Sequence, residues 1–484
     1  MRRDGNECLP MPKGSDTFEE SINQISQKCE YWERNGNSDN AVEAEVRPLV
    51  PYLLRTLGIS QSNISPEYQC SNGRRVDFAA SFLPVTSPSP ITKPDLLVEL
   101  KKPSIKFKEG ASEYIRLVSQ LRKYFDDQEC NSVKYGIIFN GRQVQLFRKH
   151  GKLSYPISSI LSVNHNEINK TIKYLQKNIQ KDEKSRGTII TVWNNRGGVG
   201  KTTIAQSLGI LISEKIRYGA KERNSVLLID YDHNQGDLTA NCKMERSEGM
   251  TKVILEADYL DKLTREKINT SLKSFTNIPV KGRSPRFPFK VKVLRADAEI
   301  SLGSQSYRNE YDTKSRLPLR NLCLKLSADF DYIIIDSPPN FEQSIFSQEA
   351  ISAADCILPL ADYQNANSIR NYANFILRQI KDVQNSRADG GPYSLGIWIN
   401  RWRSTWISTV TRNTVKNVIN NVNDNKDKLE LKRIFYKNSY RELRRIPEAA
   451  DIARSIMDAR GLPGVVRFIR ARKAFEPLLK VFVD

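Results

Sequence analysis

The segment RGGVGKTT combines three glycines with a lysine and two threonines, residue types that together can hold the phosphates of a nucleotide. Glycines let successive backbone N–H groups curl around a β-phosphate, because no Cβ stands in the way. Lys201 would reach the β- and γ-phosphate oxygens, and the hydroxyl of Thr202 would bind Mg²⁺. The residues predicted to hold the nucleotide in this loop are Arg196, Gly197, Gly198, Val199, Gly200, Lys201, Thr202 and Thr203.

The segments on either side of this loop have the patterns of a strand and a helix. Residues 189–193 are apolar and predict a buried strand, whereas residues 202–212 carry apolar side chains at helical spacing. The loop then lies at the start of the helix, where the positive end of the helix dipole favours the same phosphate charge. The sequence therefore predicts a strand, a phosphate-binding loop and a helix in that order.

Two further apolar segments end in acids. SVLLIDYD predicts a strand that ends at Asp230, with Asp232 two residues later, and YIIID predicts a strand that ends at Asp336. The carboxyl ends of parallel strands lie beside the loop that holds the nucleotide, so these acids are placed to organise Mg²⁺ or water. Either strand alone could belong to an ordinary core, but with the glycine loop they favour a nucleotide site.

Together the motifs RGGVGKTT, LLIDYDHNQGDLT and YIIIDSPP resemble the deviant Walker A, switch I and switch II motifs of the ParA/MinD-type ATPases, over about residues 186–484. The resemblance implies a doubly wound parallel sheet, ATP and Mg²⁺ as cofactors, and two protomers that enclose two ATP molecules. In that family a signature lysine before the glycines reaches the partner's nucleotide, and this chain has Arg196 there. Arginine keeps the positive charge but is longer, so whether Arg196 acts on a partner or folds back on its own loop stays open.

The same resemblance assigns roles to residues downstream of the loop. Asp232 is expected to orient the attacking water, and Asp336 to complete the Mg²⁺ shell, so that Thr202, Asp232 and Asp336 are the implied metal ligands. Asn400, which ends the apolar segment LGIWIN, is expected to contact the adenine. The residues HNQ after Asp232 replace the usual proline and glutamine, which predicts a switch loop one residue longer.

A second group of charged residues lies in the segment PDLLVELKKP, which begins as a buried strand. Glu99 and Lys101 are two residues apart and emerge on one face, while Val98 and Leu100 take the other face. A carboxylate that binds Mg²⁺ beside a lysine that stabilises developing charge suits metal-dependent hydrolysis of a phosphodiester. Glu-x-Lys is also a common accident, so this pair alone decides nothing.

Other polar residues are spaced as such a site requires. Asp77 ends an earlier strand-like segment, GRRVDFAA, which suits a hairpin partner that supplies a second metal ligand. Glu43 and Glu45 stand near the start of an amphipathic helix further upstream. Downstream, Gln120 and Tyr124 are at i and i+4 and therefore share one face of a helix.

This order of residues resembles the PD-(D/E)xK nuclease superfamily. The segments EAEVRPLVPYLLRTLG, RVDFAASF, LLVELKKP, QLRKYF and YGIIFNGRQVQLFR look like the amino-terminal nuclease domain of type I restriction R subunits over about residues 38–150. By this resemblance Asp77 and Glu99 bind metal and Lys101 is the catalytic lysine, but the helicase motor of restriction subunits is missing. The implied accessory acid is Glu45, for which Glu43 competes, and the implied pair that flanks the site is Gln120 and Tyr124.

The two resemblances divide the chain into an α/β PD-(D/E)xK nuclease domain and a ParA/MinD-like P-loop domain. The polar segment QKNIQKDEKSRG has the composition of a connector. One amphipathic helix, over residues 18–33, is expected to pack on the nuclease domain. The predicted boundaries are a helical extension over 1–37, the nuclease domain over 38–175, a linker over 176–187 and the ATPase domain over 188–484.

Composition narrows the class of partner. The formal net charge of +20 over 484 residues favours a polyanion such as DNA, because neutralised phosphates release counterions. The seven cysteines include no Cys-x-x-Cys pair, so the sequence indicates neither a zinc site nor a disulfide framework. No apolar run has the length of a spanning helix or the position of a signal peptide, which predicts a cytoplasmic protein without a membrane partner.

The interpretation that these observations favour is an ATP-regulated, Mg²⁺-dependent DNA endonuclease. ATP-driven dimerisation of the ParA-like domains would bring two nuclease domains onto one DNA. A role in prokaryotic defence against foreign DNA rests on family analogy. The alternative is a partition or positioning ATPase whose nuclease-fold domain only binds DNA, and the sequence leaves open whether a further protein supplies specificity.

Overall fold

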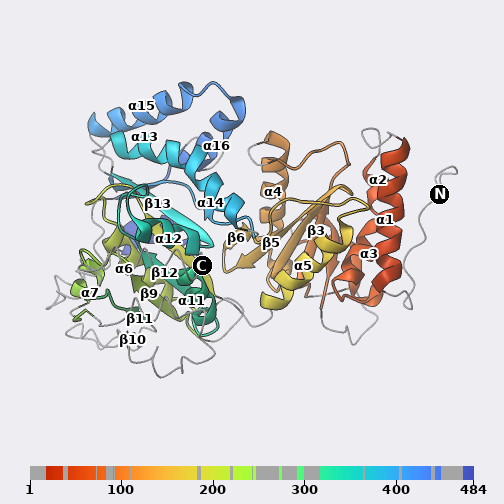
Figure 1. Cartoon of the computed structure of the whole chain (residues 1–484), viewed down its shortest axis with the longest axis horizontal. Coiled ribbons are helices and arrows are strands. Elements are labelled where there is room, and N and C mark those ends of the chain that lie inside the picture. Colours follow the sequence, from red (N-terminus) through yellow and green to blue (C-terminus); the bar gives the residue numbers. More distant parts are fainter. Residues whose placement is uncertain are drawn as a thin grey trace. The chain divides into compact units, whose positions relative to one another are not determined.

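The chain forms two compact units in the computed structural model (Figure 1). One unit comprises residues 1–183 with 388–390, and the other comprises residues 184–387 with 391–484. The structure describes residues 18–35, 42–71, 73–82, 91, 93–108, 111–182, 187–217, 222–242, 244–246, 272–274, 291–298, 317–362, 366–387, 389–402, 406–437, 442–447 and 472–483.

A mixed sheet forms the centre of the first unit, with the strand order β1-β2-β3-β4-β5-β6 and with β7 paired to β5. Strands β3 and β4 are parallel, and the other neighbours are antiparallel. A parallel pair requires a crossover, which the helix α4 provides between β3 and β4. The strands are β1 (Ile64–Gln69), β2 (Arg75–Ala80), β3 (Leu96–Leu100), β4 (Tyr135–Phe139), β5 (Gln143–His150), β6 (Leu153–Pro156) and β7 (Leu161–Ser162).

Helices cover both faces of this sheet. On one face, apolar side chains of α1, α3 and α5 pack against Phe78, Val98 and Leu100. On the other face, α4 packs against Ala79 and Leu97, the residues that alternate with the first set. The helix predicted over residues 18–33 is present as α1 and is part of this core. The helices of the first unit are α1 (Phe18–Asn35), α2 (Glu43–Val46), α3 (Leu49–Thr56), η2 (Gln61–Asn63), α4 (Ser112–Phe125), η3 (Gln128–Cys130) and α5 (Ile168–Asp182).

The end of α5 lies inside the segment predicted to be a linker. Leu175 and Ile179 are buried in the core of the first unit, and the Gln176 side chain donates a hydrogen bond to the Thr56 carbonyl at 2.6 Å. The predicted linker over 176–187 therefore begins as a packed helix. The polar residues of this segment belong to the outer face of α5. Its apolar residues recur at helical spacing and face the core.

The second unit is built on a sheet with the order β10-β11-β9-β12-β8-β13-β15-β18, with β14 beside β13. Apart from the antiparallel edge strand β10, every pair in this sheet is parallel. The strands are β8 (Thr188–Trp193), β9 (Val226–Asp230), β10 (Leu272–Ser274), β11 (Val291–Leu294), β12 (Tyr332–Asp336), β13 (Cys356–Asp362), β14 (Tyr393–Ser394), β15 (Trp398–Trp402) and β18 (Arg445–Pro447), besides a separate pair of β16 (Tyr436–Lys437) and β17 (Glu442–Leu443).

This parallel sheet is buried on both faces, as its continuous apolar strands require. Leu227 and Ile229 pack with Leu319 and Leu322 of α11, whereas Leu228 lies against Gly209 of α6. The helices are α6 (Lys201–Glu214), α7 (Asp237–Asn241), α11 (Pro318–Leu326), α12 (Ile345–Ala353), α13 (Ala366–Asn374), the π-helix Phe375–Gln379, α14 (Ile380–Ser386), α15 (Trp406–Asn420) and α16 (Asn425–Phe435).

No helix within the described residues combines the length and the apolar composition that crossing a membrane requires.

Candidate active sites

Two acids of the first unit meet across neighbouring strands. Phe78 on β2 pairs with Val98 on β3, and Asp77 and Glu99 are their neighbours in sequence. Because successive side chains of a strand alternate between faces, Asp77 and Glu99 both point away from the face that Phe78 and Val98 bury. The Asp77 carboxylate accepts a hydrogen bond from the Leu100 N–H at 2.8 Å. The antiparallel pairing of β2 and β3 thus brings together the two residues that the sequence predicts as metal ligands.

Lys101 completes this group. Its ammonium donates to Glu99 Oε1 at 2.7 Å and to the Leu100 carbonyl at 2.7 Å. Burial raises the pKa of Glu99 to about 7, although Lys101 opposes that shift. A divalent cation nearby would favour the charged form of the Glu99 carboxylate and so lower its pKa.

Arg47 and Glu43 extend the group from the amino-terminal helices. Arg47 Nη2 lies 3.1 Å from Asp77 Oδ1 and 2.5 Å from Glu67 Oε1. The pKa of Glu43 is raised by burial and then by the charge of Asp77, and Lys101 lowers it. The pKa of Glu43 therefore depends on the charges of Asp77 and Lys101.

Glu45, predicted as the accessory acid, is directed elsewhere. Its Oε2 accepts a hydrogen bond from the Trp32 indole at 3.3 Å and lies 3.6 Å from the Lys28 ammonium, both on α1. Residues two apart on a helix face different directions, so only one of Glu43 and Glu45 can face Asp77. Of the two acids, Glu43 interacts with Asp77 in the structure, which makes it the stronger candidate for the accessory acid.

Gln120 and Tyr124 form the expected pair on one face of α4. The Gln120 amide donates to the Tyr124 hydroxyl at 2.9 Å, and that hydroxyl donates to the Arg75 carbonyl at 2.9 Å. Burial raises the pKa of Tyr124 to about 12, with smaller contributions from the charges of Glu99 and Asp77. The pair therefore ties α4 to the start of β2, beside the acids.

The second unit has the predicted order of strand, loop and helix. The buried strand β8 ends at Trp193, and α6 begins at Lys201. Gly198 and Gly200 have φ angles of +74° and +91°, a backbone region that favours glycine. A Cβ added at Gly198 would meet nothing within 4 Å, so open space lies where phosphate oxygens would approach the loop.

Lys201 and three acids converge beside this loop. Lys201 is buried, its ammonium donates to the Arg196 carbonyl at 3.3 Å, and burial lowers its pKa against the charges of Asp336 and Asp232. Burial, and next the charge of Asp230, raise the pKa of Asp336 well above its usual range. A buried site with more acids than lysines suits Mg²⁺ and a polyphosphate.

Asp230 supplies a second sign of a cation site. One carboxylate oxygen accepts from the backbone and hydroxyl of Thr239 at 2.8 and 2.6 Å. Its other oxygen is buried and has no hydrogen-bond partner among the described residues. Burial raises the pKa of Asp230 to about 6. A Mg²⁺ ion with its coordinated waters would give this oxygen the partner that it lacks.

The loop after β9 is a closed turn around Asp232. The N–H groups of Gln235 and Gly236 donate to the Asp232 carbonyl at 3.1 and 2.7 Å. Arg246 donates to the carbonyl of His233 at 2.7 Å and to that of Gln235 at 2.7 Å. These bonds hold the turn so that the Asp232 carboxylate lies near Lys201.

His233, which the sequence places in this loop, is buried. Its Nδ1 accepts a hydrogen bond from the Asp297 N–H at 3.2 Å, and its ring packs against Tyr231 and Phe346. Burial lowers the pKa of His233 to about 3, so the imidazole is neutral. His233 therefore anchors the loop to the residues after β11 and adds no charge to the phosphate site.

The second unit resembles known proteins. Residues 187–389 match a family model described as an AAA domain, AAA_31. Among curated proteins, the chain is 30% identical over 173 residues to the chromosome partitioning protein ParA of Myxococcus xanthus, which covers 36% of this chain and 51% of that protein. Residues 187–389 are therefore similar to the P-loop ATPase domain of ParA-type proteins.

Further curated and solved proteins are similar to this chain. The sporulation initiation inhibitor protein Soj of Bacillus subtilis is 28% identical over 176 residues, or 36% of this chain and 57% of Soj. The chain thus spans about half the length of the curated relatives it matches. A solved ATP complex of Cyanothece McdA is 21% identical with a TM-score of 0.43, covering 62% of this chain and 98% of that one. MinD of Pyrococcus horikoshii with Mg-ADP is 14% identical with a TM-score of 0.38, covering 61% and 95%.

Strand β15 contacts the glycine loop between β8 and α6. Asn400 lies inside β15, not at its end as the sequence suggests, and its amide donates to the Val199 carbonyl at 3.0 Å. Arg401 donates to the Gly198 carbonyl and lies 3.0 Å from Asp362 Oδ2. Sequence reasoning missed Arg401, because only the pairing of β15 with β13 brings it to the loop.

A Gly200→Ala substitution is expected to weaken nucleotide binding at least about tenfold. A residue with a Cβ is strained by roughly 1–3 kcal/mol at a positive φ such as that of Gly200. The added Cβ would also lie 2.5 Å from Asn400 Nδ2. Titration with a fluorescent ATP analogue measures the loss. Adding Asn400→Ala should relieve the close contact and restore part of the affinity. Full nucleotide affinity in the Gly200→Ala single variant would contradict the assignment of this loop to phosphate binding.

Proposed function

We propose that this protein is an ATP-regulated, Mg²⁺-dependent DNA endonuclease. The observation that carries the proposal is the group formed by Asp77, Glu99 and Lys101 at the adjoining ends of β2 and β3. The first unit surrounds this group with a mixed sheet whose parallel pair is joined through α4. That arrangement supports the predicted PD-(D/E)xK nuclease domain, which would cover residues 38–175.

In this proposal the first unit hydrolyses a phosphodiester bond. Asp77 and Glu99 hold Mg²⁺, which supplies Lewis acidity and an activated water when it is bound. Lys101 stabilises the negative charge that develops on the phosphate. Tyr124 and Gln120 fix the start of β2 and so keep Asp77 in position. Glu43 takes the accessory role, since its pKa responds to Asp77 and Lys101.

The ParA/MinD-type domain binds ATP and Mg²⁺ and hydrolyses ATP in this proposal. Lys201 and the loop N–H groups hold the phosphates, Thr202 and Asp336 bind Mg²⁺, and Asp232 orients the attacking water. Asn400 lies close enough to the loop to sense nucleotide. Arg196 is exposed, so it is available to a second copy of the chain across an ATP-dependent homodimer.

DNA is the partner that both units imply. A net charge of +20 favours a polyanion, and phosphodiester chemistry requires one. Dimerisation on ATP would place two nuclease domains on one DNA and permit cleavage. A role in prokaryotic defence against foreign DNA, within the cytoplasm, follows by analogy with restriction enzymes.

Glu43→Gln and Glu45→Gln form a matched pair that tests the nuclease assignment. Glu43→Gln should slow Mg²⁺-dependent plasmid cleavage about tenfold or more, because an acid that interacts with Asp77 is removed. Glu45→Gln should leave the cleavage rate unchanged and lower the free energy of unfolding by about 0.5–1.5 kcal/mol, because its bonds to α1 weaken. Initial cleavage rates and urea unfolding measure the two effects. Equal rates for both variants, at the wild-type level, would argue against this site.

A second function is favoured by one observation. The relative at 30% identity is named a chromosome partitioning protein, which suits an ATPase that positions DNA while the first unit only binds it. That version predicts nucleotide-dependent DNA binding without any Mg²⁺-dependent cleavage. The lysine beside two acids distinguishes the proposals, because a unit that only binds DNA gains nothing from Lys101 next to Glu99.

A further inference from the structure

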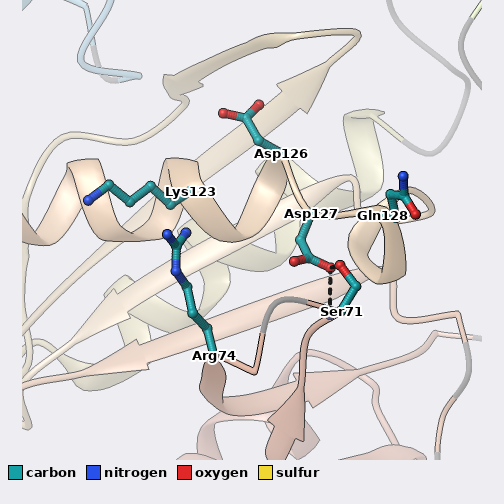
Figure 2. Close-up of a pocket in the computed structure, with 6 residues that line it drawn as sticks. All are labelled: Ser71, Arg74, Lys123, Asp126, Asp127 and Gln128. Atoms are coloured by element: carbon teal, nitrogen blue, oxygen red, sulfur yellow. Dashed lines mark hydrogen bonds between the residues drawn. The ribbon is translucent and has the colours of Figure 1, made fainter. Parts of the chain in front are cut away.

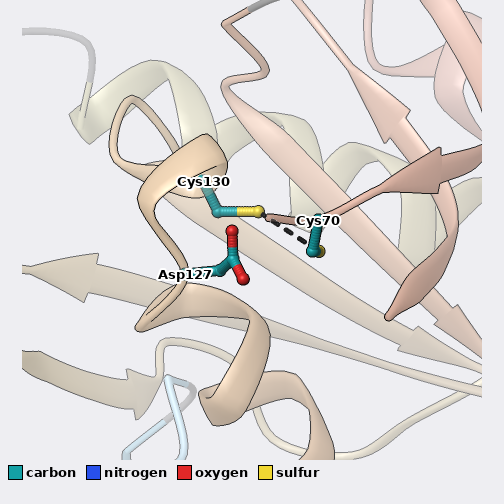
Figure 3. A group of neighbouring side chains, drawn as sticks. All are labelled: Cys70, Asp127 and Cys130. Atoms are coloured by element: carbon teal, nitrogen blue, oxygen red, sulfur yellow. Dashed lines mark hydrogen bonds between the residues drawn. The ribbon is translucent and has the colours of Figure 1, made fainter. Parts of the chain in front are cut away.

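Three side chains converge inside the first unit at a place that the nuclease chemistry does not use (Figure 3). Cys70, Asp127 and Cys130 are all buried, and one ligand atom from each lies within 4.8 Å of the others. The two sulfur atoms are 4.0 Å apart. We propose that Cys70, Asp127 and Cys130 bind one zinc ion, although the sequence spacing indicated no zinc site.

The sulfur separation fits a shared ion. With Zn–S bonds of about 2.3 Å, tetrahedral geometry places two sulfurs about 3.8 Å apart, so the observed 4.0 Å requires only a small adjustment. A disulfide requires a separation of about 2.0 Å, which is half the observed distance. The two thiols are therefore too far apart for a disulfide and form an S–H···S hydrogen bond, at a separation close to the one that a shared ion requires.

The donor set and its surroundings suit zinc. Zinc accepts both thiolate sulfur and carboxylate oxygen. Two thiolates and the Asp127 carboxylate carry three negative charges, of which a divalent ion balances two. Lys149 is also buried, and its ammonium donates to the Cys130 carbonyl at 3.0 Å, which places a positive charge beside the three ligands. The site thus approaches neutrality, as a buried cluster of charges requires.

The ligands come from two segments that hydrogen bonds already hold together. Cys70 follows β1, and Asp127 and Cys130 lie in the connection after α4. The Asp127 carboxylate oxygen Oδ1 accepts hydrogen bonds from the backbone and hydroxyl of Ser71 at 3.0 and 2.9 Å and from the Glu129 N–H at 3.1 Å. These bonds fix Asp127 beside the cysteines before any ion binds, which is the positioning that ligands at a metal site need.

A pocket adjoins Asp127, the acid ligand of this group. It has a volume of about 430 Å³ and opens beside Asp127 and Ser71, which lie side by side in Figure 2. Zinc in proteins is most often four-coordinate, so a water that enters from this pocket can supply the fourth ligand. The pocket is lined by Ser71, Arg74, Lys123, Asp126, Asp127 and Gln128.

An ion here would join two elements that flank Asp77 and Glu99. Strand β2, which carries Asp77, follows Cys70 after a short turn, and α4, which carries Tyr124, ends at Phe125 directly before Asp126 and Asp127. Zinc would fix the start of β2 against the end of α4. The role is structural and does not depend on the proposed nuclease activity, so either proposal can fail while the other stands.

The experiment is zinc analysis of the purified full-length chain, isolated with a phosphine reductant and without added metal. Mass spectrometry of the metal content should find about one zinc per chain. Cys70→Ser and Cys130→Ser should each lower that content at least about tenfold, because thiolates provide most of the affinity. Cys29→Ser, which changes another buried cysteine of the same unit, should keep the zinc.

Cobalt exchange decides the matter without any substitution. Wild-type protein loaded with Co²⁺ should show visible ligand-field bands of a tetrahedral site and a thiolate-to-cobalt charge-transfer band. A wild-type chain that lacks zinc and takes up no thiolate-bound cobalt would overturn the proposal. So would full zinc content in the Cys70→Ser/Cys130→Ser double variant, or peptide mapping that finds Cys70 and Cys130 joined as a disulfide in the protein as isolated.

Discussion

Lys101→Ala should reduce Mg²⁺-dependent DNA cleavage by about 10²–10³-fold, the usual cost of removing one group that stabilises transition-state charge. The Lys101 ammonium lies 2.7 Å from Glu99 and is the cation beside that carboxylate, directly after β3. Removing it also raises the pKa of Glu99 further, since Lys101 is the main charge that lowers it. The rate of conversion of supercoiled to nicked and linear plasmid measures the effect.

Lys102→Ala is the matched control for this prediction. Lys102 is exposed, adjacent in sequence and of equal charge, so its loss tests whether any lysine of this segment matters only for general DNA attraction. The control should cut at a rate close to wild type in low salt. Equal loss in Lys101→Ala and Lys102→Ala would show that charge, and not position beside Glu99, sets the rate.

Lys201→Ala should lower ATP hydrolysis by about 10²–10³-fold and remove every effect of nucleotide on DNA cleavage. Lys201 is buried at the start of α6, with Asp336 and Asp232 close enough to raise its pKa against the effect of burial. Without the lysine, three acids remain and repel the phosphates. Phosphate release and nucleotide-dependent cleavage, measured on one preparation, give both readouts.

Lys473→Ala is the control in the same unit. Lys473 is exposed on the helix near the carboxyl end, away from the loop residues in sequence, and its loss should leave phosphate release unchanged. Cleavage by Lys201→Ala that still responds to ATP would mean that nucleotide acts on the chain somewhere other than this loop. The expected outcome for Lys201→Ala is cleavage at the rate that wild-type protein shows without nucleotide, with no response to ATP.

Local patterns predicted the features that local physics controls. The glycines and apolar flanks of the P-loop determine a strand, a loop and a helix within one short segment, and the structure has them. The alternation around Glu99 predicts which side chains are buried, and Val98 and Leu100 lie in the core on the opposite face. These outcomes depend on neighbours in sequence, which a pattern contains.

Features that depend on contacts between distant segments were not predicted from the sequence. The choice between Glu43 and Glu45 depends on where α1 lies, because Trp32 and Lys28 bind Glu45. Cys70 and Cys130 are separated by 60 residues, and only the packing of the β1–β2 turn against the end of α4 brings their thiols together. A spacing motif cannot register such ligands.

The measurement that most directly tests the central claim is the cleavage rate of supercoiled plasmid by wild-type protein in Mg²⁺ under four conditions: no nucleotide, ADP, ATP and a non-hydrolysable ATP analogue. If ATP controls the nuclease through dimerisation, the rate should rise with ATP and with the analogue, and should depend on the square of protein concentration where dimers are scarce. Chelation of Mg²⁺ should abolish cutting in every condition. DNA that stays intact in all four conditions, while nucleotide still changes DNA binding, would contradict the nuclease and favour the positioning ATPase.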